Sequence, residues 1–355
     1  MQHHLGIIGF GGMAEYHYNT ARREDIGMQA VAVFDVREER RNRAVELGMR
    51  AYDNVEDFFA DGGFDFVLVA TPNNHHCRYV CMAMEHGFNV MCEKPAAMNV
   101  AEVEKMIEVS EKTGKFWTIH QNRRFDHDFR LIKKTMDSGV LGKPFIIESH
   151  CHCSGSGCMY NWRGMEDHGG GMFRDWGVHM LDQLLFYIDK DPVTVYANVI
   201  RIRSEEVDDF TKLVMTFDDG LVAQMDVATY APLAMHRWAV YGDRGAATID
   251  NFDSQTAKVR RIKSDKWHDN PAPAYVGEND WGIRHQNVYD VTEFEAFEVG
   301  SEGIIDDWGM IYKNIIGVLD GREELFVKPC QVLRVMKVIE AAFQSSETHQ
   351  AIQYK

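Results

Sequence analysis

Residues 5–14 read LGIIGFGGMA, a short apolar run that passes directly into a glycine-rich turn. The apolar half, residues 5–8, predicts a buried strand, and Gly9, Gly11 and Ala14 form a Gly-x-Gly-x-x-Ala element after it. In such an element the first glycine makes the tight turn, the second lets the backbone approach a pyrophosphate, and the alanine lets the helix pack on the strand. The free N–H groups at the start of that helix then face the anion. We therefore expect a dinucleotide-binding unit at the beginning of the chain.

Four further apolar runs follow, and a helical pattern separates each run from the next. Continuous apolar strands separated by helices are typical of a parallel sheet covered on both faces. The clearest helix runs from Val100 to about Lys112, with Gly114 near its end. Residues 1–122 are therefore predicted to form an α/β Rossmann domain with a parallel sheet. The four runs are residues 30–34, 64–70, 88–92 and 116–119.

After residue 122 the pattern changes to longer strands in which polar and apolar residues partly alternate. The Asp219-Gly220 pair between two of these strands is a hairpin-turn signal. Helices are expected over residues 171–188, 308–319 and 331–345, whereas residues 258–303 are polar and irregular and give no prediction. Residues 123–355 are predicted to form an α+β domain whose mostly antiparallel sheet carries helices on one face. The expected strands are residues 144–153, 193–203, 212–217, 221–228, 239–241 and 246–249.

The composition is that of a folded and strongly acidic protein. The 355 residues include 38 Lys and Arg and 54 Asp and Glu, which gives a formal net charge of −16. Such a chain repels phosphate backbones and anionic lipids, so no nucleic-acid or membrane partner is expected. No apolar run approaches the roughly 20 residues that span a bilayer. The seven cysteines are odd in number and irregularly spaced, which favours reduced thiols and a soluble, cytoplasmic protein.

An acidic residue stands where a dinucleotide site would bind ribose. Asp35 ends the second strand about 20 residues after the glycine turn, where a carboxylate can accept from both ribose hydroxyls. The same residue could instead cap the next helix or face solvent. An acid here repels a 2′-phosphate and favours NAD. Because Arg37, Arg40 and Arg41 follow at once and could accommodate that phosphate, NADP is not excluded.

Three further motifs stand out. TPNNHH at residues 71–76 and EKP at 93–95 each follow a predicted strand, and DWGVH at 175–179 follows the glycine run at 169–171. With the glycine turn, and with the segments listed below, this ordered set resembles the Gfo/Idh/MocA oxidoreductase family, which includes glucose–fructose oxidoreductase and inositol dehydrogenases. The resemblance implies a Rossmann domain followed by an open-faced, mainly antiparallel sheet that forms the subunit interface of a homo-oligomer, a dimer or a tetramer. The additional segments are NRRF at 122–125, GVLGKP at 139–144 and AAFQSS at 341–346.

Lys94, Asp175 and His179 are the predicted catalytic residues. Lys94 lies at the end of a buried parallel strand, where a side chain points into the nucleotide crevice, although an isolated lysine usually reaches solvent. Asp175 and His179 stand four residues apart on one helix face, a spacing that also fits a surface pair. The resemblance implies that Lys94 contacts cofactor and substrate. It also implies that His179 is a general base on a substrate hydroxyl, with Asp175 orienting it and binding a neighbouring hydroxyl.

The resemblance and the strand ends together give a set of expected binding residues. Asn73 could instead cap a helix, and Trp162 could be a core residue. One departure from the family is visible, because Asp126, His127 and Asp128 replace the proline usual after the Arg-Phe pair. The expected cofactor-binding residues are Gly9, Phe10, Gly11, Gly12, Met13, Asp35, Arg37, Thr71, Pro72, Asn73, His76, Glu93, Lys94, Trp162 and Arg163. The expected substrate-binding residues are Lys94, Asn122, Arg124, His152, Asp175 and His179.

The sequence His150-Cys151-His152-Cys153 invites comparison with a zinc site. In a strand, however, the two cysteines face one way and the two histidines the other, so four ligands cannot converge. No metal is therefore expected.

These observations lead to one function and two alternatives. We expect an NAD(P)-dependent oxidoreductase that moves a hydride between nicotinamide and a hydroxyl-bearing carbon of a sugar, glycoside or cyclitol. In one alternative, tightly bound NAD oxidises the substrate transiently, so that glycoside cleavage or disproportionation results. In the other, the fold serves as a non-catalytic, dinucleotide-sensing regulator, which would not need Lys94, Asp175 and His179.

Overall fold

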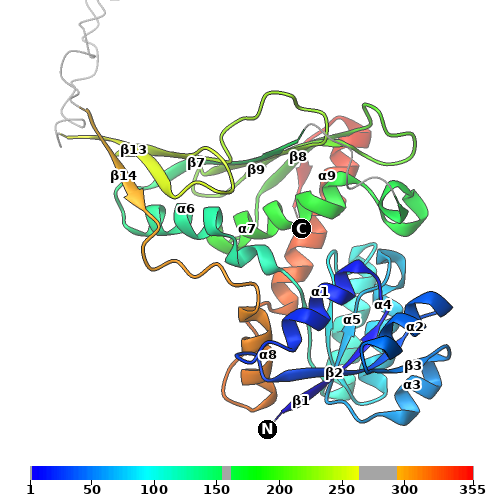
Figure 1. The fold of residues 1–355 in the computed structure, drawn as a ribbon. Helices are drawn as coiled ribbons and strands as arrows, with labels where there is room; N and C mark the ends of the chain where they lie inside the picture. The colour runs from blue at the N-terminus through cyan, green and yellow to red at the C-terminus, as the bar shows by residue number, and fades with distance from the viewer. Residues whose placement is uncertain (1, 154–160, 264–293, 355) are drawn as a thin grey trace, which may run out of the picture.

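The computed structural model describes residues 2–153, 161–263 and 294–354. The chain forms a six-stranded and a nine-stranded sheet, and Figure 1 shows the two as separate layers with helix α9 (Pro329–Thr348) running between them. Within the described residues, no helix is both long enough and apolar enough to cross a membrane.

The six-stranded sheet is parallel throughout, in the order β3-β2-β1-β4-β5-β6. The five predicted strands are all present, and their central residues are buried on both sides, which explains their continuous apolar character. The sequence reading missed β3, which has only three residues and is partly exposed. The strands are β1 His3–Ile8, β2 Met28–Phe34, β3 Arg50–Tyr52, β4 Phe66–Val69, β5 Asn89–Cys92 and β6 Trp117–Ile119.

Helices connect these strands and cover both faces of the sheet. Helix α5 ends at its predicted signal, Gly114, which has a φ of 68°. At its start, the side chain of Asn99 accepts from Glu102 N–H (2.9 Å). The helices of this half are α1 Gly12–Ala21, α2 Glu38–Glu46, α3 Val55–Asp61, the 3₁₀ turn η1 Asn73–His75, α4 His76–Glu85 and α5 Val100–Thr113.

The nine-stranded sheet has the order β14-β13-β12-β11-β7-β10-β9-β8-β15. Among the strands described, β7 with β10 is the one parallel pairing, so the prediction of a mostly antiparallel sheet is confirmed. Strand β14 and most of β13 lie within residues 258–303, for which no element was predicted. The strands are β7 Pro144–His152, β8 Thr194–Ile200, β9 Phe210–Thr216, β10 Val222–Ala228, β11 Trp238–Gly242, β12 Gly245–Ile249, β13 Thr256–Ile262, β14 Phe294–Gly300 and β15 Ile352–Gln353.

Helices cover one face of this sheet, as Figure 1 shows for α6 (His127–Asp137) and α7 (Val178–Ile188). The opposite face carries exposed Tyr196, Ile200 and Tyr241, which is the open face that the resemblance implies. A π-helical turn, η5 (Phe173–Gly177), leads directly into α7, where the sequence predicted one continuous helix. Three short 3₁₀ turns complete the described elements: η2 Asn122–Phe125, η3 Trp162–Gly164 and η4 Glu166–His168.

Helix α8 (Met310–Leu319) comes after the second sheet in sequence but packs against the first. Ile311, Tyr312 and Ile315 share one hydrophobic core with Leu5 and Ile7 of β1. The C-terminal part of the chain therefore helps to build the Rossmann half, and the division of the chain at residues 122 and 123 stays a prediction.

A buried ion pair joins α7 to the segment that leaves β6. Arg124 Nε and Nη2 donate to the two oxygens of Asp182, both at 2.7 Å, and the two side chains are only 1% and 2% exposed. A third guanidinium nitrogen, Nη1, donates to Gln331 Oε1 of α9 (3.0 Å). An acidic residue on an apolar helix needs such a partner, because a buried charge is costly unless it is paired.

We predict that Asp182→Asn lowers the free energy of unfolding by about 3–5 kcal/mol, because it leaves the Arg124 charge buried without a counter-charge. The double variant Arg124→Met with Asp182→Leu should recover most of that loss. Urea unfolding measures both. Asp137→Asn, which breaks the exposed Lys133–Asp137 pair, is the control and should cost less than about 1 kcal/mol. Equal losses for the buried and exposed pairs would show that the Arg124 pair has no special weight.

Candidate active site

A cavity of about 630 Å³ lies at the carboxyl ends of the parallel strands. Such strand ends are where open parallel sheets bind ligands. One wall consists of loops that follow β1, β2, β4 and β5, and the other of residues 161–163 and 168 from the second half of the chain. The lining residues are Gly9, Phe10, Gly11, Gly12, Met13, Phe34, Asp35, Val36, Arg37, Arg40, Ala70, Thr71, Pro72, Asn73, His75, Tyr79, Glu93, Lys94, Asn161, Trp162, Arg163 and His168.

The glycine turn has the geometry that its sequence predicts. Gly9 has a φ of 85°, and a Cβ there would lie 2.9 Å from Ala70 O, so only glycine fits. At Gly11 and Gly12, no atom of the described chain lies within 4 Å of where a Cβ would be, which keeps this part of the cavity open. Helix α1 begins here without a side-chain cap from the described residues. Its first N–H groups therefore fit a bound phosphate.

Asp35 holds the turn and faces the cavity. Its Oδ2 accepts from Phe10 N–H (2.7 Å) and its Oδ1 accepts from Arg37 N–H (2.9 Å). Each carboxylate oxygen has two lone pairs, so both can still accept from ribose hydroxyls. Arg37 and Arg40 also line the cavity, which leaves NADP open. These features fit a dinucleotide.

Lys94 lines the cavity and forms an ion pair with Asp175 of the π-helical turn. Lys94 Nζ donates to Asp175 Oδ1 and to Asp175 O, both at 2.7 Å, and Arg163 Nε donates to the same Oδ1 at 3.2 Å. Burial alone would raise the pKa of Asp175, but the charges of Lys94 and Arg163 hold it below its usual value. Asp175 therefore holds Lys94, and the expected contact of Asp175 with His179 is replaced by this pair.

His179 is buried on α7, with 5% of its surface exposed. Its Nδ1 lies 3.0 Å from Gln121 Oε1, so Gln121, which sequence reasoning missed, takes the orienting position expected of Asp175. Burial lowers the pKa of His179 well below its usual value, and the charges of Lys94 and Arg123 lower it further. The imidazole is consequently neutral near pH 7 and able to accept a proton.

The loop after β4 contributes Asn73 but not His76 to the cavity wall. Asn73 Nδ2 donates to Gly169 O (2.8 Å), while its Oδ1 is buried without a partner among the described residues and can accept from a bound molecule. His76 Nδ1 and Nε2 lie 2.7 Å from Pro95 O and 3.0 Å from Thr71 O. The structure does not bring His76 to its predicted cofactor contact, because both ring nitrogens face backbone carbonyl oxygens and the residue does not line the cavity.

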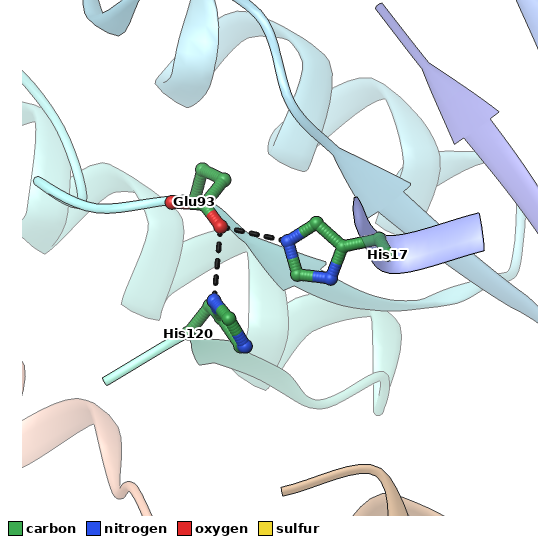
Figure 2. Close-up of side chains that lie close together, drawn as sticks. All are labelled: His17, Glu93 and His120. Carbon is green, nitrogen blue, oxygen red and sulfur yellow. Dashed lines mark hydrogen bonds and ion pairs between the residues drawn. The ribbon is translucent and has the colours of Figure 1, made fainter. Parts of the chain in front are cut away.

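Glu93 is the centre of a buried network that supports Lys94. His17 Nε2 and His120 Nδ1 lie 2.7 and 2.9 Å from Glu93 Oε1, and Figure 2 shows the two imidazoles approaching it from two sides. Tyr312 of α8 lies 2.7 Å from His17 Nδ1. Burial would raise the pKa of Glu93, but the two imidazoles hold it well below its usual value. Burial lowers the pKa of His17 to about 4.

The same three residues could be considered as metal ligands, because their ligand atoms lie within 4.8 Å of one another. Nitrogen and oxygen ligands of tetrahedral zinc, at about 2.0–2.2 Å from the ion, are roughly 3.3 Å apart. The observed separations of 2.7 and 2.9 Å are those of hydrogen bonds. We therefore describe the group as a hydrogen-bonded network.

Three expected substrate contacts lie elsewhere in the structure. Arg124 is used up by Asp182, as described above. His152 and His150 lie on one face of β7, and Ser149 lies on the other. The face of Ser149 is the one toward α7, because Arg237 donates both to Ser149 Oγ and to Gln183 Oε1 of α7. Asn122 is buried in η2, outside the cavity wall. Of the three predicted catalytic residues, Lys94 lines the cavity. Asp175, which binds Lys94, and His179 lie outside its wall.

Two protein-family models match the chain. The oxidoreductase family with an NAD-binding Rossmann fold matches residues 3–121, and the GFO/IDH/MocA C-terminal domain matches residues 129–248. The chain belongs to the Gfo/Idh/MocA family of oxidoreductases. This result confirms the predicted family, the Rossmann fold, the dehydrogenase class and NAD as the cofactor.

Individual relatives agree with this assignment. The chain is 27% identical to the myo-inositol 2-dehydrogenase of Thermotoga maritima over 270 residues, 74% of this chain and 79% of that one. It is 28% identical to the D-glucoside 3-dehydrogenase of Escherichia coli over 233 residues, 64% of this chain and 63% of that one. A solved NAD-binding protein from Listeria innocua is 31% identical, with a TM-score of 0.84 over 99% of this chain and 97% of that chain.

We predict that Asp35→Ala weakens the binding of NAD⁺ more than that of NADP⁺, because the variant loses a ribose acceptor and an anion that repels the 2′-phosphate. Fluorescence titration of both cofactors measures the two dissociation constants. The exposed residue Asp218, replaced by alanine, is the control. A larger loss for NADP⁺ would reverse the predicted preference.

Asp208 anchors the backbone just before Asp175, and it gives a second prediction. Its Oδ2 accepts from Phe173 N–H (2.7 Å), and burial raises its pKa to about 6. The folded protein therefore retains a proton that the unfolded chain releases near pH 4, so stability falls as the pH rises from about 4 to about 6, by roughly 3 kcal/mol. Asp208→Asn keeps an acceptor but cannot titrate.

Urea unfolding of wild type and Asp208→Asn across pH 4–7 should give two curves whose difference changes over that interval. Parallel curves would contradict the raised pKa of Asp208.

Proposed function

We propose that this protein is an NAD-dependent dehydrogenase that oxidises a hydroxyl-bearing carbon of a sugar, glycoside or cyclitol. The observation that carries the proposal is the position of Lys94. Lys94 lines the same cavity as the glycine turn and Asp35, and Asp175 holds its ammonium group at 2.7 Å. The charge of Lys94 also lowers the pKa of the buried His179, which is neutral.

These groups supply what oxidation of an alcohol needs. Lys94 Nζ has three donors, and it can bind a substrate oxygen while it keeps its bond to Asp175. His179 accepts the hydroxyl proton as the carbon–oxygen double bond forms and the C–H bond breaks with its electron pair. Lys94 and Arg163 stabilise negative charge that develops on the oxygen. When bound, NAD⁺ supplies the hydride acceptor.

The cavity wall divides into a part that fits the cofactor and a part left for substrate. The glycine turn and Asp35 fit the pyrophosphate and the adenosine ribose, and Asn73 Oδ1 offers an unused acceptor beyond them. Trp162, with Arg163 stacked 4.4 Å over its ring, lies on the opposite wall. An aromatic face there suits the apolar side of a sugar ring or of a nicotinamide.

The substrate class rests on the relatives named above, which act on myo-inositol and on D-glucosides by their names. Both substrates are rings with several adjacent hydroxyl groups, which suits a site with more than one donor and acceptor. We also propose that the protein is a cytoplasmic homo-oligomer whose subunits meet at the open face of the nine-stranded sheet.

Single-turnover absorbance near 340 nm tests the proposed function. Enzyme and NAD⁺ are mixed at comparable concentrations with a panel of pyranoses, glycosides and inositols. A rise that persists and scales with added NAD⁺ supports an exchangeable cofactor. A rise limited to one enzyme equivalent, or one that decays, supports transient oxidation by bound NAD instead. Silence across the panel with intact NAD⁺ binding would contradict the substrate class.

We predict that Lys94→Ala lowers kcat by roughly 10²–10⁴-fold, because it removes the cation beside the reacting oxygen. The dissociation constant of NAD⁺ should change by less than about threefold, since the glycine turn and Asp35 remain. Lys143→Ala, which removes an exposed lysine, is the control. If Lys94→Ala kept kcat/KM within about threefold of wild type, the assigned role would be wrong.

A further inference from the structure

The imidazole of His179 has one hydrogen-bond partner in the described chain, the side-chain amide of Gln121. Nδ1 lies 3.0 Å from Gln121 Oε1. An amide oxygen can only accept, so Nδ1 must carry the proton that is donated. In a neutral imidazole, the second nitrogen, Nε2, then holds the free lone pair.

Gln121 is itself held in place. It is buried, and both of its backbone groups are bonded. Its backbone N–H donates to Ile119 O (2.8 Å), and its backbone carbonyl oxygen accepts from Arg124 N–H (3.2 Å). The preceding residue, His120, donates its N–H to Cys92 O (2.9 Å) and binds Glu93 through its ring, as Figure 2 shows. The residue that directs His179 therefore belongs to the same network that supports Lys94.

The segment around Gln121 is also fixed to α7, the helix that carries His179. Gln183 Nε2 donates to Arg123 O (2.6 Å), and Arg124 binds Asp182 through both oxygens. In both segments these bonds come shortly after the contact between Gln121 and His179. They hold the two backbones together next to that contact.

We propose that Gln121 is the positioning residue that fixes His179 in the tautomer with the proton on Nδ1 and the lone pair on Nε2. The inference rests on the proposed function, in which His179 takes the proton of the substrate hydroxyl. Gln121 acts only through His179. It keeps Nε2 of His179 unprotonated and fixes the direction of its lone pair.

An amide suits this position better than a carboxylate. The charged and titratable groups near His179 are Lys94 and Glu93 from the loop after β5, and His120 and Arg123 from the segment after β6. A carboxylate at position 121 would favour the imidazolium, which has no lone pair for a proton. Glutamine orients the ring and leaves it neutral.

Nitrogen-15 NMR of protein labelled in its histidines reads the tautomer directly, without turnover. The resonances of His179 are assigned by their absence from His179→Gln. We expect wild type to show a protonated Nδ1 and an unprotonated Nε2, and Gln121→Met to show a mixture or the reverse tautomer. A wild-type protein with its proton on Nε2 would overturn the inference, even if no variant of Gln121 folded.

The kinetic consequence is a loss in kcat with a shift of pH dependence. Gln121→Met should lower kcat by roughly 10- to 100-fold, less than the 10²–10⁴-fold expected for loss of the base itself, while KM and NAD⁺ binding change little. Gln121→Glu restores an acceptor, so it should recover kcat at high pH. The acid limb of its kcat/KM profile should move up by about 1–3 pH units.

Thr118→Val is the control, because it removes a buried hydrogen bond near this segment, from Thr118 Oγ1 to Val327 O, and no bond to His179. It should lower thermal stability and leave the pH profile in place. If Gln121→Met and Gln121→Glu both kept the wild-type rate and profile while His179→Ala was inactive, the inference on Gln121 would fail alone. If His179→Ala retained kcat, the proposed function would fail instead.

Discussion

The ion pair between Lys94 and Asp175 is the contact on which the candidate site depends, because it joins the two halves of the chain at the cavity wall. Lys94 comes from the loop after β5, and Asp175 from the π-helical turn before α7. Both groups are largely buried, so the attraction between them is weakly screened by solvent. Behind Lys94 the carboxylate of Glu93 receives two imidazoles, and behind Asp175 the backbone of Phe173 is held by Asp208. Each partner of the pair is thus fixed by its own buried anion.

Most of the fold was predictable because its signals are local. The five apolar runs, the glycine turn and the glycine that ends α5 each depend on a few neighbouring residues, and from them the parallel sheet was predicted correctly. The parts that were missed depend on distant contacts. Strand β3 has only three residues, which is too few for a recognisable pattern. Helix α8 packs on β1 through Ile311 and Ile315, and no feature of the local sequence predicts this contact. The π-helical turn interrupts a segment whose sequence reads as an ordinary helix.

The same distinction applies to the site. Glycine positions, Asp35 and Lys94 were predictable because strand ends converge at one edge of a parallel sheet. Partners within the site were not, because the choice between them is made by the packing of helices far apart in sequence. Asp175 was expected to orient His179, yet it binds Lys94. Gln121, which lies 58 residues from His179 in the chain, orients the imidazole instead. The side chains of His76 and Arg124 are of types that often bind ligands. In the fold, however, His76 contacts the carbonyl oxygen of Pro95, and Arg124 forms an ion pair with Asp182. A polar side chain is free for function only after the fold has satisfied its own buried groups.

The proposed function requires that these residues hold an alcohol so that its carbon-bound hydrogen passes directly to the cofactor. A substrate that carries deuterium on the carbon of its reacting hydroxyl tests this in one turnover. The enzyme is mixed with NAD⁺ and the labelled substrate, and the reduced cofactor is examined by proton NMR and mass spectrometry. We expect one deuterium at C4 of the nicotinamide, on a single face of the ring. Deuterium found in the solvent, or retained entirely in the product, would contradict it.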